Sequence, residues 1–235
     1  MIRRSAAVRA AAIAVIALMV IPIFVVNAFR VLANDWFVRH ELGRGSFPAD
    51  RYGLQGPERL DLALTGLRSI RPESDGIVLL ERAALPDGSP AFDSRELRHM
   101  ADVRSRLGVA FAAQLAALAL LAALTAALFR SQRWRTVVPR GLLYGSLATL
   151  GVAALAVPVI LLGFDGFFLR FHQLFFSGAT WRFSETDTLL RIYPEAFWQD
   201  TARFAAGIVI AQAVGVAAAA GWWLRRLRTA PRSPA

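Results

Sequence analysis

The chain has 235 residues, of which 56% are hydrophobic, and it carries a formal net charge of +10. Its apolar residues occur in long blocks, which excludes an ordinary soluble globular domain. It contains no cysteine, so disulfide frameworks, thiol nucleophiles and cysteine-based metal sites are also excluded.

Four apolar blocks are predicted to form transmembrane helices. A helix of about 18 or more apolar residues, rising about 1.5 Å per residue, can cross a hydrocarbon core of about 30 Å. The first block is longer than the apolar core of a signal peptide and lacks a small-residue cleavage site, so we expect it to remain as a helix. The four predicted spans are residues 8–29, 107–129, 141–163 and 204–224.

The distribution of charge predicts how these helices are oriented. All 17 acidic residues fall in segments 30–106 and 164–203. In the other segments outside the spans, every charged residue is an arginine. The positive-inside rule therefore predicts cytoplasmic termini, a cytoplasmic loop at 130–140, and extracytoplasmic positions for both acid-containing segments. Arginines beside spans contact anionic lipid headgroups, so the positive charge does not indicate a nucleic-acid partner.

These observations divide the chain into five segments. They comprise the N-terminus with helix one (1–29), an extracytoplasmic cap (30–106), helices two and three with their loop (107–163), an extracytoplasmic aromatic segment (164–203), and helix four with a cytoplasmic tail (204–235).

The cap is expected to be small and of mixed α/β structure. Leucines at helical spacing predict a helix over 58–70. The apolar stretch 77–84, a Pro-Asp-Gly turn at 86–88 and a short stretch at 90–92 predict a β-hairpin. The predicted fold is thus four transmembrane helices with a mixed α/β cap.

The second transmembrane helix is predicted to begin before the membrane, at Asp93. Glu96 follows three residues later and completes a capping-box pattern. A helix that continues from here into the second span would hold His99 at the boundary between water and lipid. Asp102, three residues beyond His99, could orient the imidazole; the alternative is an ordinary solvated histidine.

The segment after the third span combines aromatic and polar residues. Eleven aromatic residues lie between positions 164 and 198, together with His172. An interfacial aromatic belt is one explanation. The other is a site that binds acyl chains, in which aromatic walls surround a few fixed polar groups. Because His99 and His172 are both predicted at the same membrane face, acid–base chemistry on a lipid-like substrate is the favoured hypothesis.

Short motifs in these segments resemble the lipoprotein intramolecular transacylase (Lit) family of four-span bacterial membrane proteins. The matching strings are H-M-A-D-V at 99–103, F-H-Q-L-F-F-S-G at 171–178 and T-D-T-L-L-R-I-Y-P-E at 186–195, with a weaker match in D-R-Y-G at 50–53.

The resemblance implies an enzyme of the bacterial inner membrane whose active site faces the extracytoplasmic side. Such enzymes act on diacylglyceryl-modified lipoproteins and move an acyl chain from the sn-2 glyceryl position to the α-amine of the N-terminal cysteine. The product is a lyso-form lipoprotein. The two catalytic histidines of the family correspond to His99 and His172.

This chemistry suits the residues present. An intramolecular transfer from ester to amine needs a base and a proton donor, and it needs no cofactor, metal or enzyme nucleophile. Either histidine could take either role. The expected supporting or orienting residues are Asp102, Asp187, Arg191, Arg170 and Trp181, and the expected substrate pocket is formed by Phe171, Phe175, Phe176 and Tyr193.

Two other hypotheses are compatible with the residues. The protein could be a non-catalytic scaffold whose outer segments bind a partner. It could also be a lipid hydrolase that uses a metal ion or Ser177, although neither a metal-ligand motif nor a nucleophile elbow is present.

Overall fold

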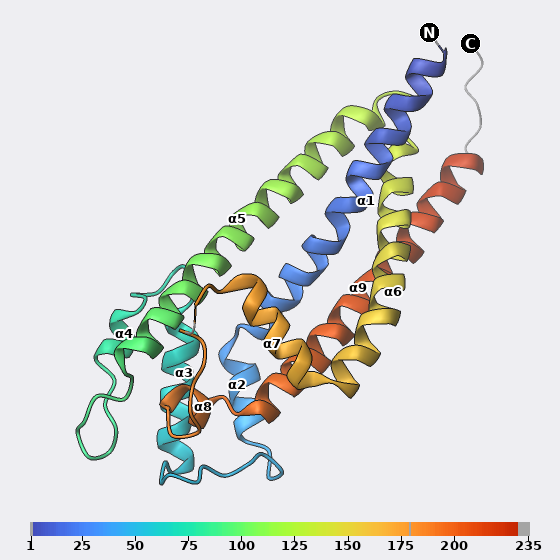
Figure 1. Ribbon diagram of the computed structural model, residues 1–235. Helices are drawn as coiled ribbons and strands as arrows, with labels where there is room; N and C mark the ends of the chain where they lie inside the picture. Colours follow the sequence, from blue (N-terminus) through green and yellow to red (C-terminus); the bar gives the residue numbers. More distant parts are fainter. Residues whose placement is uncertain (1, 179, 230–235) are drawn as a thin grey trace. The chain divides into compact units, whose positions relative to one another are not determined.

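The computed structural model describes residues 2–178 and 180–229, and this part of the chain is almost entirely helical (Figure 1). Residues 230–235 of the predicted cytoplasmic tail lie outside it. The helices are α1 (Ile2–Leu32), α2 (Asp35–Leu42), α3 (Gly56–Ser69), α4 (Val78–Glu81), α5 (Ser94–Phe129), α6 (Val137–Leu162), α7 (Phe164–Phe175), α8 (Thr188–Ile192) and α9 (Glu195–Thr229).

Each of the four predicted spans lies within a helix that is long and apolar enough to cross a bilayer. These helices are α1, α5, α6 and α9. Most of their side chains are not buried inside the protein, as expected where lipid covers the outer surface.

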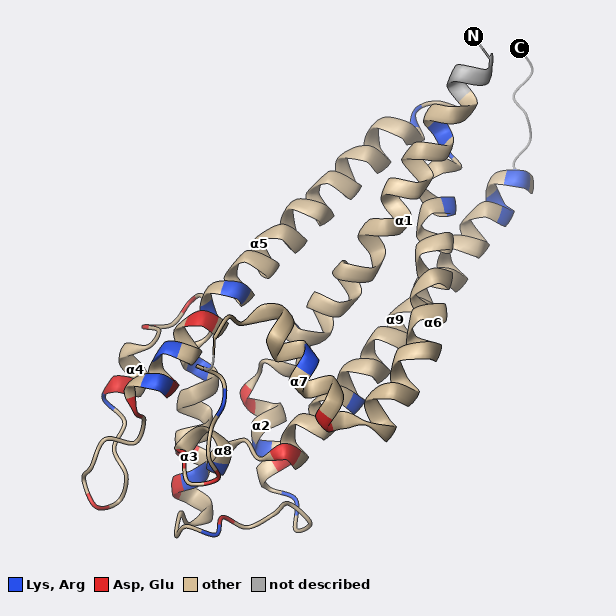
Figure 2. Ribbon diagram, viewed as in Figure 1, with Lys and Arg blue, Asp and Glu red and all other residues tan. Residues whose placement is uncertain are grey.

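The chain divides into two compact units. The first contains residues 1–28, 112–158 and 205–235, and the second contains residues 29–111 and 159–204. All 17 acidic residues belong to the second unit, whereas the charged residues of the first unit are all arginines, at its helix ends and in the α5–α6 loop (Figure 2).

Close approach of α1 and α6 holds the first unit together. A Cβ atom at Gly141 would lie 2.6 Å from Ile16, and one at Gly145 would lie 2.7 Å from both Val20 and the Ala17 carbonyl oxygen. These two glycines, four residues apart, form a small-residue stripe that lets two transmembrane backbones pack directly.

We expect Gly145→Leu to destabilise the first unit. The added side chain has no space against α1, and overpacking of this kind costs about 1–3 kcal/mol in free energy of unfolding. Thermal unfolding in detergent micelles should show a lower midpoint. Gly151→Leu is the control because nothing lies within 4 Å of its added Cβ on the same helix; equal midpoints for the two variants would contradict the prediction.

The second unit forms a helical cap, so the expected α/β cap is wrong. Residues 78–81 form a helical turn, and the turn at 86–88 is flanked only by an isolated bridge between Ala84 and Pro90. The described residues contain no strand. Pro86 and Pro90 lack the N–H groups that a longer ladder would need, and Leu80, 1% exposed, packs into the cap core from a helical turn instead.

The predicted helices of the cap are confirmed. The expected helix over 58–70 is α3, which packs against α2, α4 and α8. The predicted capping box of α5 is also present: Asp93 Oδ1 accepts hydrogen bonds from the N–H groups of Arg95 and Glu96, and Glu96 Oε2 accepts one from the Asp93 N–H. This cap fixes the start of α5 and the position of the residues that follow.

Candidate functional site

His99 lies near the beginning of α5. A helix of 36 residues is about 54 Å long, much longer than the hydrocarbon core of about 30 Å. Its polar first turns, before residue 107, therefore extend beyond the apolar stretch. The His99 side chain is nevertheless buried, with 8% of its surface exposed.

His172 lies on α7, which starts directly after α6 with only Gly163 between them. Helical spacing places the phenylalanines of this helix on one face, and His172 lies beside that face, four residues after Phe168. The phenylalanines are Phe164, Phe167, Phe168, Phe171 and Phe175.

The structure brings the two imidazoles together inside the second unit. Their ring centroids are 6.1 Å apart and the ring planes are inclined by 27°. Phe176 contacts both rings, at 4.9 Å from His99 and 5.5 Å from His172. Phe183 lies 5.3 Å from His99, and Trp181 lies 5.1 Å from His172. The pair is thus enclosed by aromatic rings contributed by the segment after α7.

A single hydrogen bond determines the tautomer of neutral His172. Its Nδ1 lies 2.8 Å from the carbonyl oxygen of Phe168. A carbonyl oxygen can only accept, so Nδ1 carries the hydrogen. In the neutral ring, Nε2 is then the unprotonated nitrogen and can accept a proton.

Two nitrogen atoms of this site, one in the pair and one beside it, are buried without a hydrogen-bond partner in the described part of the chain. They are Nδ1 of His99 and Nε1 of Trp181. The indole nitrogen is a donor only, so it is available to an oxygen atom of a bound molecule. Buried polar atoms without partners are uncommon and frequently belong to functional sites.

Burial lowers the pKa of His172, and the hydrogen bond to the Phe168 carbonyl opposes this shift only in part. The imidazole is therefore neutral at pH 7 and its Nε2 is free to act as a base. Protonating this base therefore requires a lower pH than protonating an ordinary histidine.

We expect the titration midpoint of His172 to lie below its ordinary value of 6.5. NMR spectra of histidine-labelled protein in micelles can follow this directly, because the chain contains only three histidines. The His172→Gln variant assigns the resonance. A midpoint at or above the ordinary value would contradict the burial of this ring.

The two expected orienting carboxylates form other contacts. Asp102 is paired with Arg106 at 3.4 Å, and Asp187 is paired with Arg95 at 2.6 Å. Asp187 also accepts a hydrogen bond from the Ser184 N–H. Among the residues that the structure describes, neither carboxylate forms a hydrogen bond with an imidazole, and the carbonyl of Phe168 orients His172 instead.

The expected pocket residues fall into two groups. Phe171, Phe175 and Phe176 lie on or just after α7, where Phe171 and Phe176 contact the His172 ring. Tyr193 belongs to the cap core, where its hydroxyl donates to the Ala63 carbonyl oxygen. Arg170 is exposed on α7.

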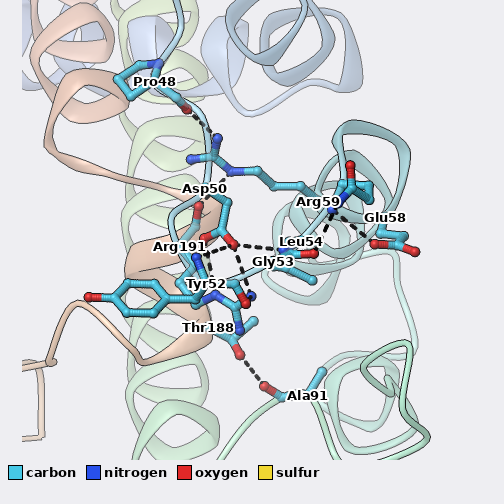
Figure 3. Close-up of polar contacts among 11 residues, drawn as sticks. Pro48, Asp50, Tyr52, Gly53, Leu54, Glu58, Arg59, Ala91, Thr188 and Arg191 are labelled. Atoms are coloured by element: carbon cyan, nitrogen blue, oxygen red, sulfur yellow. Dashed lines mark hydrogen bonds and ion pairs between the residues drawn. The ribbon is translucent and has the colours of Figure 1, made fainter.

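Arg191, another expected site residue, binds a loop of the cap (Figure 3). Its guanidinium donates to both carboxylate oxygens of Asp50, at 3.2 and 3.1 Å. The same carboxylate accepts hydrogen bonds from the N–H groups of Tyr52 and Leu54. These bonds hold the pKa of Asp50 below its usual value even though burial acts to raise it.

Arg59, on α3, binds the backbone on both sides of this ion pair (Figure 3). It is 6% exposed and donates to the carbonyl oxygens of Arg191 and Pro48. The sequence motif at 50–53 includes Asp50 but indicated no role for it, and sequence reasoning missed Arg59. One available indication was that Arg59 shares a helical face with Ala63 and Gly66, both of which are buried.

The alternatives that require a metal ion or a serine find little support in the geometry. Within residues 2–178 and 180–229, no group of three or more histidine and acidic side chains lies close enough together to hold a metal ion. Ser177 is exposed after the end of α7.

Comparison with known proteins gives matches over most of the chain. The model of the lipoprotein intramolecular transacylase (Lit) family matches residues 77–198. An uncharacterised protein of Aquifex aeolicus is 32% identical over 177 residues, which cover 75% of this chain and 78% of the relative.

Solved structures of the membrane-integral transacylase Lit from Bacillus cereus share the fold. One has a TM-score of 0.71 at 17% identity and covers 96% of this chain and 100% of the other. A histidine-to-alanine variant of it gives 0.71 at 18% identity, covering 97% and 99%. These matches and the four apolar helices make the chain a multi-pass membrane protein.

Proposed function

The chain belongs to the lipoprotein intramolecular transacylase family and is therefore an acyltransferase, and we propose that His99 and His172 catalyse its reaction. The acyl chain moves from the sn-2 glyceryl oxygen of a diacylglyceryl lipoprotein to the α-amine of the N-terminal cysteine. The observation that carries this proposal is the pair of imidazoles, that of His99 buried and that of His172 half-buried, with ring centroids 6.1 Å apart within an aromatic enclosure.

His172 is the base in this mechanism. Its Nδ1–H bond to Phe168 leaves Nε2 free to take a proton from the attacking amine. The nitrogen forms a bond to the acyl carbon, and the bond from that carbon to the glyceryl oxygen breaks. The proton held by His172 then passes to the departing glyceryl oxygen, so both histidines end the cycle unchanged.

His99 acts as a hydrogen-bond donor to the oxygen on which negative charge develops. Burial among aromatic rings strengthens such a bond because water does not compete for it. Trp181, whose indole N–H has no partner in the described residues, supplies a second donor to the substrate.

The aromatic rings contribute by holding the substrate. Phe171, Phe175 and Phe176 provide apolar surface for the acyl chains beside His172. Placing ester and amine together makes the transfer effectively unimolecular, which is the largest advantage available to a reaction that uses no cofactor. The structural roles of Asp187 and Arg191 are then to hold α8 and the residues just before it against the rest of the cap.

We place this site on the extracytoplasmic side of the bacterial inner membrane, with both termini in the cytoplasm. The support is the charge distribution. The unit that carries the histidines contains every acidic residue, and the charged residues of the other unit are all basic. Segments 30–106 and 164–203 then form the extracytoplasmic part.

Expression in a bacterial host that lacks other lipoprotein N-acylation tests the proposed function. Mass spectrometry of its lipoproteins should detect an N-acyl group and a lyso-glyceryl moiety on the N-terminal cysteine. Free α-amines in every lipoprotein, in cells that contain the protein in the membrane, would refute the proposal.

A further inference from the structure

Helix α8 is anchored to α5 by a carboxylate. Its N-cap residue, Asp187, makes no side-chain bond to the helix N-terminus. Instead, the N–H of Leu189 in the first turn of α8 donates to Glu96 Oε1 at 2.8 Å, across 93 positions of sequence. A side chain of one helix therefore supplies the cap that another helix lacks.

Both oxygens of Glu96 are occupied in this way. Oε2 accepts the N–H of Asp93 at 2.8 Å, which closes the capping box of α5, while Oε1 binds α8. Glu96 is 2% exposed, and no ion pair involves it in the described part of the chain. Two N–H groups thus take the place of water around this carboxylate. Because a buried charge is costly unless it is hydrogen-bonded, both donors must stay within bonding distance of its oxygens.

The position of Glu96 relates it to both histidines. It lies one helical turn before His99 on α5. Through Leu189 it also binds the chain that runs on from His172 and carries Phe183, whose ring is 5.3 Å from His99. One carboxylate therefore joins the start of α5, which carries His99, to α8, and the residues that precede α8 include Phe183 and Trp181, whose rings contact His99 and His172.

We propose that Glu96 is a positioning residue that keeps His99 and His172 at the separation required for acyl transfer. This inference rests on the proposed function. Glu96 does not contact substrate; it acts by fixing α8 and the preceding aromatic residues against the start of α5.

The variant Glu96→Gln tests this role. A glutamine oxygen can accept one N–H, but its amide NH₂ would face the other N–H donor, so one of the two bonds is lost. Because a small misplacement of reacting groups can lower a rate by about 100-fold, we expect kcat to fall by about 10- to 100-fold. KM should stay close to that of the parent protein. The substrate is a synthetic S-diacylglyceryl cysteinyl peptide, with product measured by mass spectrometry.

Glu58→Gln is the matched control. Glu58 has the corresponding place in the capping box of α3, where only its Oε2 accepts an N–H, from Gln55. Glutamine can keep that single bond, so kcat should stay within about twofold, as for other mild surface changes.

A second readout does not depend on activity. Cross-relaxation between the imidazole protons of His99 and His172, whose centroids are 6.1 Å apart, should weaken in Glu96→Gln and persist in Glu58→Gln. If Glu96→Gln folds poorly, Glu96→Asp keeps the charge but is too short to bridge both donors, and the same changes are expected.

The outcomes separate the two proposals. Parent-like kcat and cross-relaxation in Glu96→Gln, with His99→Ala inactive, would overturn the positioning role and leave the proposed function intact. Failure of both Glu96 variants to fold would assign Glu96 to stability alone and also overturn it. Activity in both His99→Ala and His172→Ala would refute the proposed function itself.

Discussion

Replacing His172 with alanine should lower acyl transfer by at least about 100-fold, and His99→Ala should have an effect of similar order, since a positioned acid–base group contributes about 10²- to 10⁴-fold. Both proteins should remain folded in the membrane, because the imidazoles pack mainly against other aromatic side chains. Mass spectrometry of lipoproteins from the expressing cells measures the loss.

His40→Ala is the control for these substitutions. His40 is exposed on α2, where its ring lies 6.2 Å from Phe204, so transfer should continue at the parental rate. Glutamine variants then separate the roles of the pair. His99→Gln keeps an N–H donor and should retain more activity than His172→Gln, which cannot hold a proton. The reverse order would contradict the assignment of His172 as the base.

Asp50→Ala should be the most destabilising change in the cap, with a loss of about 3–5 kcal/mol in free energy of unfolding, as for other buried ion pairs that lose one partner. The side chains of Asp50 and Arg191 are 2% and 9% exposed. Removing the carboxylate leaves the buried guanidinium without its ionic partner, although its hydrogen bond to the Tyr52 carbonyl oxygen remains, and the N–H groups of Tyr52 and Leu54 lose their acceptor. Denaturation followed in micelles measures the change.

The double variant Asp50→Ala/Arg191→Ala isolates the ion pair. Because the second substitution removes the unpaired charge, the double variant should lose less stability than the sum of the two single variants. Asp102→Ala provides a comparison, since this carboxylate is 45% exposed in its pair with Arg106 and surface pairs contribute at most about 1 kcal/mol. Equal losses for Asp50→Ala and Asp102→Ala would show that burial does not matter here.

Features that depend on neighbouring residues were predictable from the sequence. The transmembrane helices follow from the length of each apolar block, because a bilayer requires every backbone group in a span to be satisfied within that span. The start of α5 follows from Asp93 and Glu96, since a capping box needs only four consecutive residues. The assignment to a family of acyltransferases similarly followed from short motifs around the two histidines.

The prediction of a β-hairpin over 77–92 failed because the local preferences of this stretch are weak. The stretch 77–84 is apolar, and periodicity alone does not distinguish a short buried strand from a short helix. The helical turn α4, which packs against α3, buries Leu80 and is therefore favoured over a strand. Pro86 and Pro90 limit the β pairing to one bridge.

What the sequence established about this protein was therefore the number of its spans, the helical start of the second one and the two histidines as candidates. The tertiary structure decided which groups each side chain contacts. Asp187 pairs with Arg95, Arg191 with Asp50, and Glu96 with the backbone of Leu189. These contacts join segments about ninety or more positions apart in the sequence, so no local pattern encodes them; they arise only when α8 packs against α3 and the start of α5.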